Sequence, residues 1–197
     1  MNRRAFDRML ATFGVALAVL LLVVGGLATL AHSFIDNQVR AQLTQQQIVF
    51  PAANSPELAD PAIGPYLSQY AGQQLTNGAQ AKALADHYIA VHLQGIGGGK
   101  TYAQLSAAAL ARPTDTALAK QVDSMFKGET VRGILLNAYA FWKMGVIAAW
   151  VAFVSVIGAC VLLLLSALGL WHTRRTDPTA MGLAALPRVP ALSQHHG

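Results

Sequence analysis

The sequence predicts an all-α membrane protein, built as a two-helix transmembrane hairpin that carries a helical domain outside the lipid. Two stretches contain no Lys, Arg, Asp or Glu, residues 9–35 and residues 144–173. Each exceeds the roughly 20 apolar residues that a helix needs to cross the hydrocarbon core of a bilayer. Between them lies a long segment of ordinary polar composition with eight basic and seven acidic residues. We therefore expect two spans and one sizeable domain outside the membrane.

This pattern divides the chain into five predicted parts. The spans are residues 9–35 and 144–171, and the domain between them is residues 36–143. Residues 1–8 are a short cytoplasmic segment, and residues 172–197 are a cytoplasmic tail that we expect to be disordered, because it is rich in proline and poor in bulky residues.

The positive charge of the chain orients the two predicted spans. The net charge of +5 comes from the two ends, since the charges of the intervening domain nearly cancel. Lys and Arg near a span are retained on the cytoplasmic side, whereas long loops cross the membrane regardless of their charge. The topogenic residues would be Arg3, Arg4, Arg8, Arg174 and Arg175. We expect a multi-pass plasma-membrane protein with both termini in the cytoplasm, an extracytoplasmic domain and no affinity for nucleic acid.

Three further features of the spans bear on this prediction: two flanking tryptophans, the length of the first apolar run and a single cysteine. Trp142 and Trp171 flank the second span at a separation of about 43 Å along a helix, which suits anchors at the two membrane interfaces. The first span could instead be a signal peptide with a weak cleavage site at residues 29–31, although its apolar run exceeds the usual length of about 7–15 residues. The single cysteine, Cys160, lies in the second span, so the domain has no disulfide.

The domain itself is expected to be entirely helical. Residues 36–47 should extend the first span up to Pro51, and a turn-rich connector with four prolines follows over residues 51–65. Further helices are predicted over residues 66–75, 79–94 and 115–127, with one more that begins at a capping box, Thr101 to Gln104, and ends before Pro113. We expect Gly128 to end the helix over residues 115–127, and Thr130 to cap a last helix that enters the second span.

Small residues recur at a seven-residue period in both spans. Such residues allow close backbone approach in lipid, where the hydrophobic effect does not drive association, and the period favours a left-handed crossing. This seam could pair the two spans with each other or with another membrane subunit, and chance periodicity in Ala- and Gly-rich helices is the remaining alternative. The predicted seam residues are Ala11, Gly14, Ala18, Gly25, Ala28, Gly145, Ala148, Ala152, Ser155, Ala159 and Ser166.

The predicted domain contains no sequence motif that matches a metal site, a phosphate-binding loop or a catalytic serine. His87 and His92 are five residues apart, about 140° around a helix, so with Asp86 they make a poor metal site. The glycine-rich stretch at residues 95–101 has Gln94 where a phosphate-binding loop requires its first glycine. There is no Gly-x-Ser-x-Gly motif. We therefore expect no catalytic, cofactor-binding or metal site, and no enzyme activity.

Three stretches carry a resemblance to a known group of proteins: "MNRRAFDRML", "GPYLSQYAGQQLTNGAQAKALADHYIAVHL" and "FKGETVRGILLNAYAFWKMG". The chain resembles a family of small two-span membrane proteins of actinobacteria such as mycobacteria. Members often bear an automatic label as an aromatic ring-opening dioxygenase subunit. That label implies an intracellular iron site with His and carboxylate ligands, and this sequence offers no such set. The resemblance therefore supplies no site residues.

These observations favour a structural or interaction role, as an accessory component of an envelope or membrane complex. The implied partners are the lipid bilayer and other membrane subunits or a second copy of the chain. The alternative is an extracytoplasmic ligand-sensing module that signals through a partner, because the cytoplasmic tail is too short for an output domain. A polar pocket between the domain helices would favour that alternative.

Overall fold

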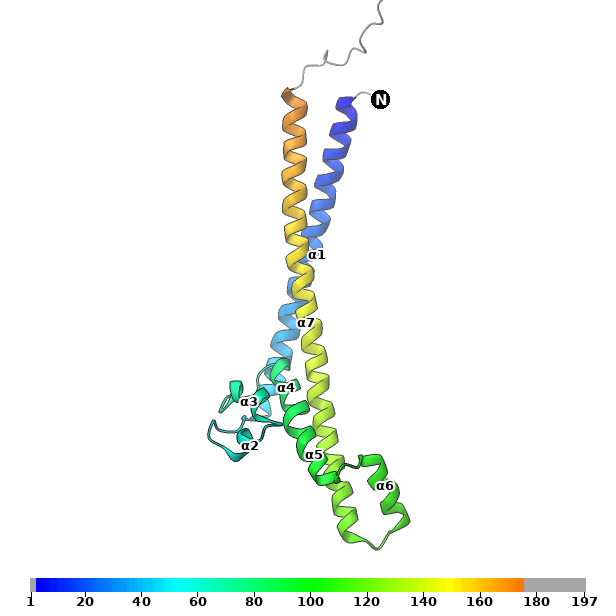
Figure 1. Cartoon of the computed structure of the whole chain (residues 1–197). Helices are drawn as coiled ribbons and strands as arrows, with labels where there is room; N and C mark the ends of the chain where they lie inside the picture. Colours follow the sequence, from blue (N-terminus) through cyan, green and yellow to red (C-terminus); the bar gives the residue numbers. More distant parts are fainter. Residues whose placement is uncertain (1–2, 176–197) are drawn as a thin grey trace, which may run out of the picture. The chain divides into compact units, whose positions relative to one another are not determined.

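The computed structural model describes the backbone of residues 3–175 and the side chains of residues 6–172 (Figure 1). Within this range the chain is all-helical, as the sequence predicts, and its nearest approach to a strand is one isolated bridge between Val49 and Gln74. The helical elements are α1 (Arg3–Gln45), α2 (Pro56–Ala59), α3 (Gly64–Leu67), the 3-10 helix η1 (Ser68–Tyr70), α4 (Gly78–Leu84), the π-helical turn η2 (Ala85–Ile89), α5 (Ala90–Gly97), α6 (Tyr102–Ala111) and α7 (Thr116–Arg175).

Two of these helices are long and apolar enough to cross a membrane, namely Phe6–Gln45 within α1 and Thr116–His172 within α7. The core helix of a soluble protein would be mostly buried. In contrast, only 17% of the most apolar window of α1 and 22% of that of α7 is buried inside the protein. Large side chains such as Phe13, Leu30 and Trp150 are more than 60% exposed. The apolar surface of both helices is therefore left uncovered by the other described residues.

The described residues fall into two compact units. The first unit combines the start of α1, up to Val23, with the end of α7, from Ser155. The second unit is Val24–Val154, which holds the rest of both long helices and all the short ones.

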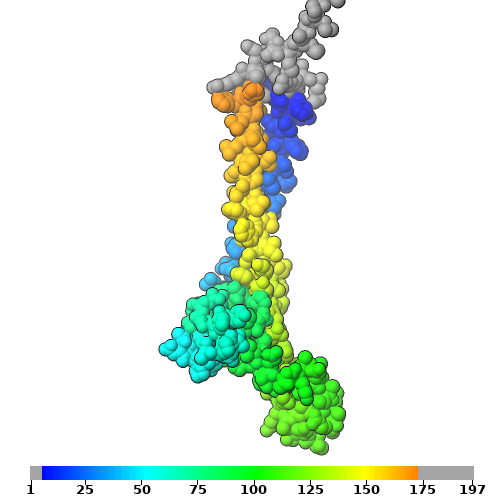
Figure 2. Space-filling view, in the orientation of Figure 1, coloured from blue at the N-terminus to red at the C-terminus, as the bar shows by residue number. Residues whose placement is uncertain are grey.

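The second unit has two hydrophobic clusters. The larger cluster lies where α1, α4 and α7 meet the loop segments around α2 and α3, and Phe50, Leu67 and Leu75 are its largest fully buried side chains. The smaller cluster joins α5, α6 and α7 through Leu93, Leu105, Leu118 and Met125. In the space-filling view the α6 region forms a bulge separate from the one around α2, α3 and α4 (Figure 2). The unit therefore has two small cores along α7.

Local sequence signals explain where several helices begin and end. The predicted capping box at Thr101 is confirmed, since its hydroxyl accepts from the Gln104 backbone N–H and the Gln104 side chain accepts from the Thr101 N–H. Asn77 makes an equivalent box with Gln80 at the start of α4. The helix predicted over residues 79–94 is present as α4, η2 and α5, with one π-helical turn in its middle. Gly98 then ends α5 in the left-handed conformation, with φ of 56°.

The prediction that Gly128 ends a helix and that Thr130 caps the next one is wrong. The helix α7 passes through both residues without a break, and the Thr130 hydroxyl donates to the Phe126 carbonyl within it. A Cβ on Gly128 would lie 2.4 Å from Cδ2 of Leu93. The glycine therefore lets α5 pack closely against α7. In the sequence, a glycine required for such packing looks the same as a glycine that ends a helix.

The region between α1 and α4 also differs from prediction. The helix expected over residues 66–75 is limited to α3 and η1, and α2 begins in the proline-rich connector, where Ser55 caps it and Pro56 takes the first position. Residues 71–75 are not helical because their backbone pairs with the segment after α1. The Phe50 N–H donates to the Gln73 carbonyl at 2.9 Å, and the Leu75 N–H donates to the Ile48 carbonyl at 2.8 Å.

Candidate interaction surfaces

Small residues bring α1 and α7 together within the first unit. A Cβ on Gly14 would lie 2.3 Å from Oγ of Ser166, and one on Gly158 would lie 3.2 Å from Cδ1 of Leu21. Ala18 and Ala159 are completely buried although they carry only a methyl group. The two helices are therefore in contact with each other at the predicted seam positions of this unit, at a spacing that larger side chains would prevent.

The same kind of contact occurs between α1 and α7 within the second unit. A Cβ on Gly145 would lie 3.0 Å from Cγ2 of Ile35. The Nδ1 atom of His32 lies 3.0 Å from the Gly145 carbonyl oxygen, to which it donates a hydrogen bond. Over both units, the seam residues that are buried are Ala11, Ala18, Gly25, Gly145, Ala152, Ser155, Ala159 and Ser166. Those that are half-buried are Gly14, Ala28 and Ala148.

The predicted membrane anchors occupy different environments. Trp142 is half-buried against the larger hydrophobic cluster, and its Cβ and ring atoms leave no room for a side chain on Gly78 of α4. Trp171 is 53% exposed. Among the topogenic arginines only Arg8 has a described side chain, which is exposed, while the side chains of Arg3, Arg4, Arg174 and Arg175 lie outside the described residues. The predicted tail at residues 176–197 lies outside them as well.

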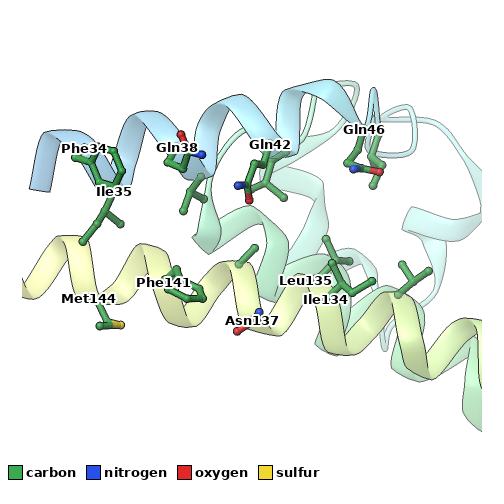
Figure 3. A pocket seen from close by; sticks show the side chains of 15 residues that line it. Phe34, Ile35, Gln38, Gln42, Gln46, Ile134, Leu135, Asn137, Phe141 and Met144 are labelled. Atoms are coloured by element: carbon green, nitrogen blue, oxygen red, sulfur yellow. The ribbon is translucent and has the colours of Figure 1, made fainter. Parts of the chain in front are cut away.

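A groove of about 510 Å³ runs between α1 and α7 in the second unit (Figure 3). We call it the α1–α7 groove. It is lined by Phe34, Ile35, Gln38, Val39, Gln42, Leu43, Gln46, Ile48, Val131, Ile134, Leu135, Asn137, Ala138, Phe141 and Met144. Its inner residues Val39, Leu43 and Leu135 belong to the larger hydrophobic cluster. Phe34, Ile134 and Phe141 remain 70%, 63% and 52% exposed, so the groove is an uncovered apolar surface.

The polar groups of the groove are all uncharged. Gln38 and Gln42 are four residues apart on α1, so their exposed amides share one face of that helix, and Gln46 lies in the turn directly after it. Asn137 lies on α7 (Figure 3). None of the fifteen lining residues is Lys, Arg, His, Asp or Glu. The spacing of the glutamines was visible in the sequence, but the apolar wall of α7 opposite them was not.

A charged cluster lies elsewhere in the second unit, where η2 meets α7. The Asp86 carboxylate accepts from the Lys82 ammonium and, at 3.5 Å, from the Arg132 guanidinium, which also lies 3.5 Å from a Glu129 oxygen. The hydrogen bond from Lys82 holds the pKa of Asp86 below its usual value, and the charges of Lys82 and Arg132 add to this effect against partial desolvation. Asp86 is therefore an ion-pair residue, with its oxygens already engaged.

Beside this cluster is a hollow of about 400 Å³. Its polar lining consists of Asp86, Gln94, Lys100, Thr101, Glu129 and Arg132, and its apolar lining includes Leu93 and Met125. The Nε atom of Arg132 is buried here without a hydrogen-bond partner in the described part of the chain. Because Asp86 is 46 residues from Arg132, no local sequence pattern could have predicted this site.

The candidate metal and phosphate motifs have structural roles. The His87 ring stacks on Tyr66, with ring centroids 3.5 Å apart, and His92 Nδ1 donates to the Tyr88 carbonyl at 2.7 Å. The described residues contain no group of three or more His, Cys, Asp or Glu side chains placed to hold a metal ion. In the phosphate-loop-like stretch, Gly98 and Gly99 form the turn from α5 to α6, both at positive φ, whereas Gly95 and Gly97 lie within α5.

Comparisons with known proteins add no family. The chain matches no protein-family model, no curated protein sequence and no solved structure. The resemblance to actinobacterial two-span proteins therefore stays a prediction.

Proposed function

We propose that the protein is a two-span plasma-membrane protein with a structural or interaction role, as an accessory component of an envelope or membrane complex. Both termini would lie in the cytoplasm, and residues 36–143 would form an extracytoplasmic helical domain. The partners would be lipid and other membrane proteins, or a second copy of the chain. In this proposal the protein is not an enzyme, which agrees with the engagement of Asp86, His87 and His92 in ion-pair, stacking and backbone contacts.

One observation carries the proposal. Helices α1 and α7 each pass without a break from a charge-free, largely uncovered apolar segment into the folded part of the second unit. Because both long helices are continuous, the domain would be joined to the membrane by a helix at each of its ends, with no flexible linker. Such a construction suits a domain that binds a partner close to the membrane surface.

The topology can be tested by labelling single cysteines in intact cells with a membrane-impermeant maleimide. In a Cys160→Ser background, Leu110→Cys on α6 should be labelled from outside, since Leu110 is 82% exposed. Phe6→Cys, which is 47% exposed, should be labelled only after the cells are opened. The reverse pattern would overturn the proposed orientation, and labelling of both positions from outside would overturn the two-span topology.

The interaction role can be tested by purifying the tagged full-length protein in mild detergent from its native membranes. A stoichiometric membrane complex, or a defined oligomer of the chain, is the expected result. Its contacts can be mapped with a photo-crosslinking amino acid at Phe126, which is 54% exposed, and at Leu110 as the comparison site. A strictly monomeric protein without any partner would overturn this role.

A second candidate, extracytoplasmic ligand sensing through a partner, is favoured by the hollow beside Arg132. Its mixed charges, Lys100 and Arg132 with Glu129, suit a small zwitterionic ligand such as an amino acid. Calorimetric titration of the full-length protein with a panel of free amino acids, with Lys100→Met as the control variant, tests it. Absence of binding across the panel would leave the interaction role alone.

A further inference from the structure

We propose that the α1–α7 groove binds one acyl chain of a membrane amphiphile that has an uncharged, hydroxyl-bearing headgroup. This proposal rests on the proposed insertion of the two spans in a bilayer. It goes beyond the interaction role, because that role names no ligand for the groove. Four observations lead to it: where the groove begins, what its wall is made of, which polar groups it offers, and how large it is.

The groove begins where the charge-free segments end. Ile35 and Met144 line one end of the groove. Ile35 is the last residue of the charge-free stretch of α1, and Met144 is the first residue of the charge-free stretch of α7. From Phe34 to its last residue, Gln45, α1 runs along the groove for about 16 Å at 1.5 Å per residue, and Gln46 lines the groove just beyond the helix end. An acyl chain could therefore slide out of the lipid along α1 without crossing water, because the apolar surface of the span continues directly into the groove.

The wall of the groove is an apolar surface that lacks a cover. Phe34, Ile134 and Phe141 are each more than half exposed. Ile134 and Phe141 lie outside the predicted second span, and Phe34 lies in the last turn of the predicted first span. Contiguous apolar patches of this kind mark binding sites for apolar partners. The remainder of the second unit already covers the opposite side of Val39, Leu43 and Leu135, so only the open side of the groove needs an occupant.

The polar groups of the groove select the headgroup. Gln38, Gln42 and Gln46 offer both N–H donors and C=O acceptors, which is the combination that pairs with hydroxyl groups. A phosphate or carboxylate placed beside these amides would find no cationic side chain among the lining residues. A charged headgroup would therefore lose its hydration without an ionic partner, which disfavours it.

The size of the groove argues against a helix as its occupant. The groove has a volume of about 510 Å³, which lies in the range of small-molecule sites, roughly 300–1,000 Å³. A helix 10–12 Å in diameter and about 16 Å long would occupy on the order of 1,300–1,800 Å³. A helix from a second copy could therefore place only side chains in the groove, whereas a single extended hydrocarbon chain fits within it.

The proposal can be tested with a photoreactive lipid. The full-length protein is reconstituted in phosphatidylcholine nanodiscs with a hexadecyl glucoside that carries a diazirine in its alkyl chain, illuminated, digested and mapped by mass spectrometry. The same diazirine chain on phosphocholine and on a carboxylate provides the headgroup comparison. We expect adducts between Gln38 and Gln46, at the end of α1, and near Ile134 on α7, with the glucoside labelling them roughly fivefold to tenfold more than the carboxylate.

Matched variants separate the groove from its surroundings. Gln42→Trp would fill the groove from its exposed rim, whereas Gln45→Trp places the same ring on an exposed position of α1 that does not line the groove. Groove labelling should fall roughly fivefold or more in Gln42→Trp and stay unchanged in Gln45→Trp. Gln42→Leu should keep the chain adducts but lose the preference for the glucoside.

Two results would overturn the proposal. The first is groove labelling no greater than that of the α6 peptide Tyr102–Ala111, while residues 9–35 are strongly labelled. The second is efficient disulfide formation between copies that carry Gln42→Cys in a Cys160→Ser background, which would assign the groove to a second copy. If residues 9–35 themselves escape labelling, the proposed membrane insertion fails as well, so the two failures are distinguishable.

Discussion

The helix contact of the first unit and the hydrophobic cores of the second unit are packed by opposite means. In the first unit the smallest side chains are buried most completely, with Ala18 and Ala159 at 0% exposure. In the second unit the fully buried positions include large side chains, with Leu67 and Leu75 at 0% and Phe50 at 2%, beside Ala81 and Ala85 at 0%. The first arrangement depends on backbone proximity and dispersion contacts, and the second on removing apolar area from water. Enlarging a side chain should therefore disrupt the helix contact of the first unit, and truncating a side chain should disrupt the cores of the second unit.

The largest expected effect is truncation in the second unit. Phe50→Ala should destabilise this unit by about 3–5 kcal/mol, because the ring is buried and packs against Tyr70 at a centroid distance of 5.2 Å. Denaturant unfolding in detergent micelles, followed by tryptophan fluorescence, measures the loss. Leu110→Ala is the control, since an 82% exposed side chain on α6 should cost almost nothing. Equal stabilities of the two variants would refute this account of the core.

The second prediction concerns the first unit, where an enlarged side chain should weaken the helix contact. Ala18→Leu should weaken the contact of α1 with α7 by about 1–3 kcal/mol, because a completely buried methyl position has no space for three more carbons. The readout is the rate of disulfide formation between Gly14→Cys and Ser166→Cys in a Cys160→Ser background, which Ala18→Leu should slow. Val19→Leu, at a 53% exposed position one residue away, should leave the rate unchanged. A similar rate in both variants would mean that the seam does not hold these helices together.

Two glycines of α7 should respond in opposite ways to the same substitution, because only one of them contacts another helix. Gly133→Ala should stabilise the protein by about 0.5–1 kcal/mol, because alanine favours a helix interior and nothing lies within 4 Å of the new methyl group. Gly128→Ala should instead destabilise it by about 1–2 kcal/mol, since the methyl group would meet the buried side chain of Leu93. The measurement is the unfolding midpoint of each variant. Stabilisation by both substitutions would show that Gly128 is not a packing residue.

The smallest effect concerns the charged cluster of the second unit. Because the pKa of Asp86 is lower in the folded state than its unfolded value of about 3.9, its contribution to stability is present above that value. The contribution is lost as pH falls through the lower folded pKa. Asp86→Asn should therefore reduce stability at neutral pH, by about 1 kcal/mol or less for a partly exposed pair, and flatten the acid limb of stability against pH.

The control for this last prediction is Asp123→Asn. Asp123 is 58% exposed and pairs with Lys127 one turn away on the same helix. Its loss should change neither the neutral-pH stability nor the acid limb measurably. If Asp86→Asn behaved in the same way, the bond to Arg132 would contribute nothing to the attachment of η2 to α7.

Some features of this protein follow from the sequence by itself. The all-helical class, the two long apolar helices and the capping box at Thr101 were predictable, because charge-free runs, helical periodicity and caps involve residues within a few turns of each other. The same local signals failed at Gly128, where the reason for the glycine is a contact with Leu93, 35 positions away.

The contacts between residues far apart in the chain, and the surfaces that remain exposed, are visible only in the tertiary structure. It pairs Gly14 with Ser166 and Gly145 with Ile35, joins Asp86 to Arg132, and replaces a predicted helical turn at residues 71–75 with backbone pairing to the segment after α1. It also leaves the α1–α7 groove uncovered. These outcomes depend on close fit between residues far apart in the chain, and a seven-residue period or a row of glutamines does not specify the partner that will fit.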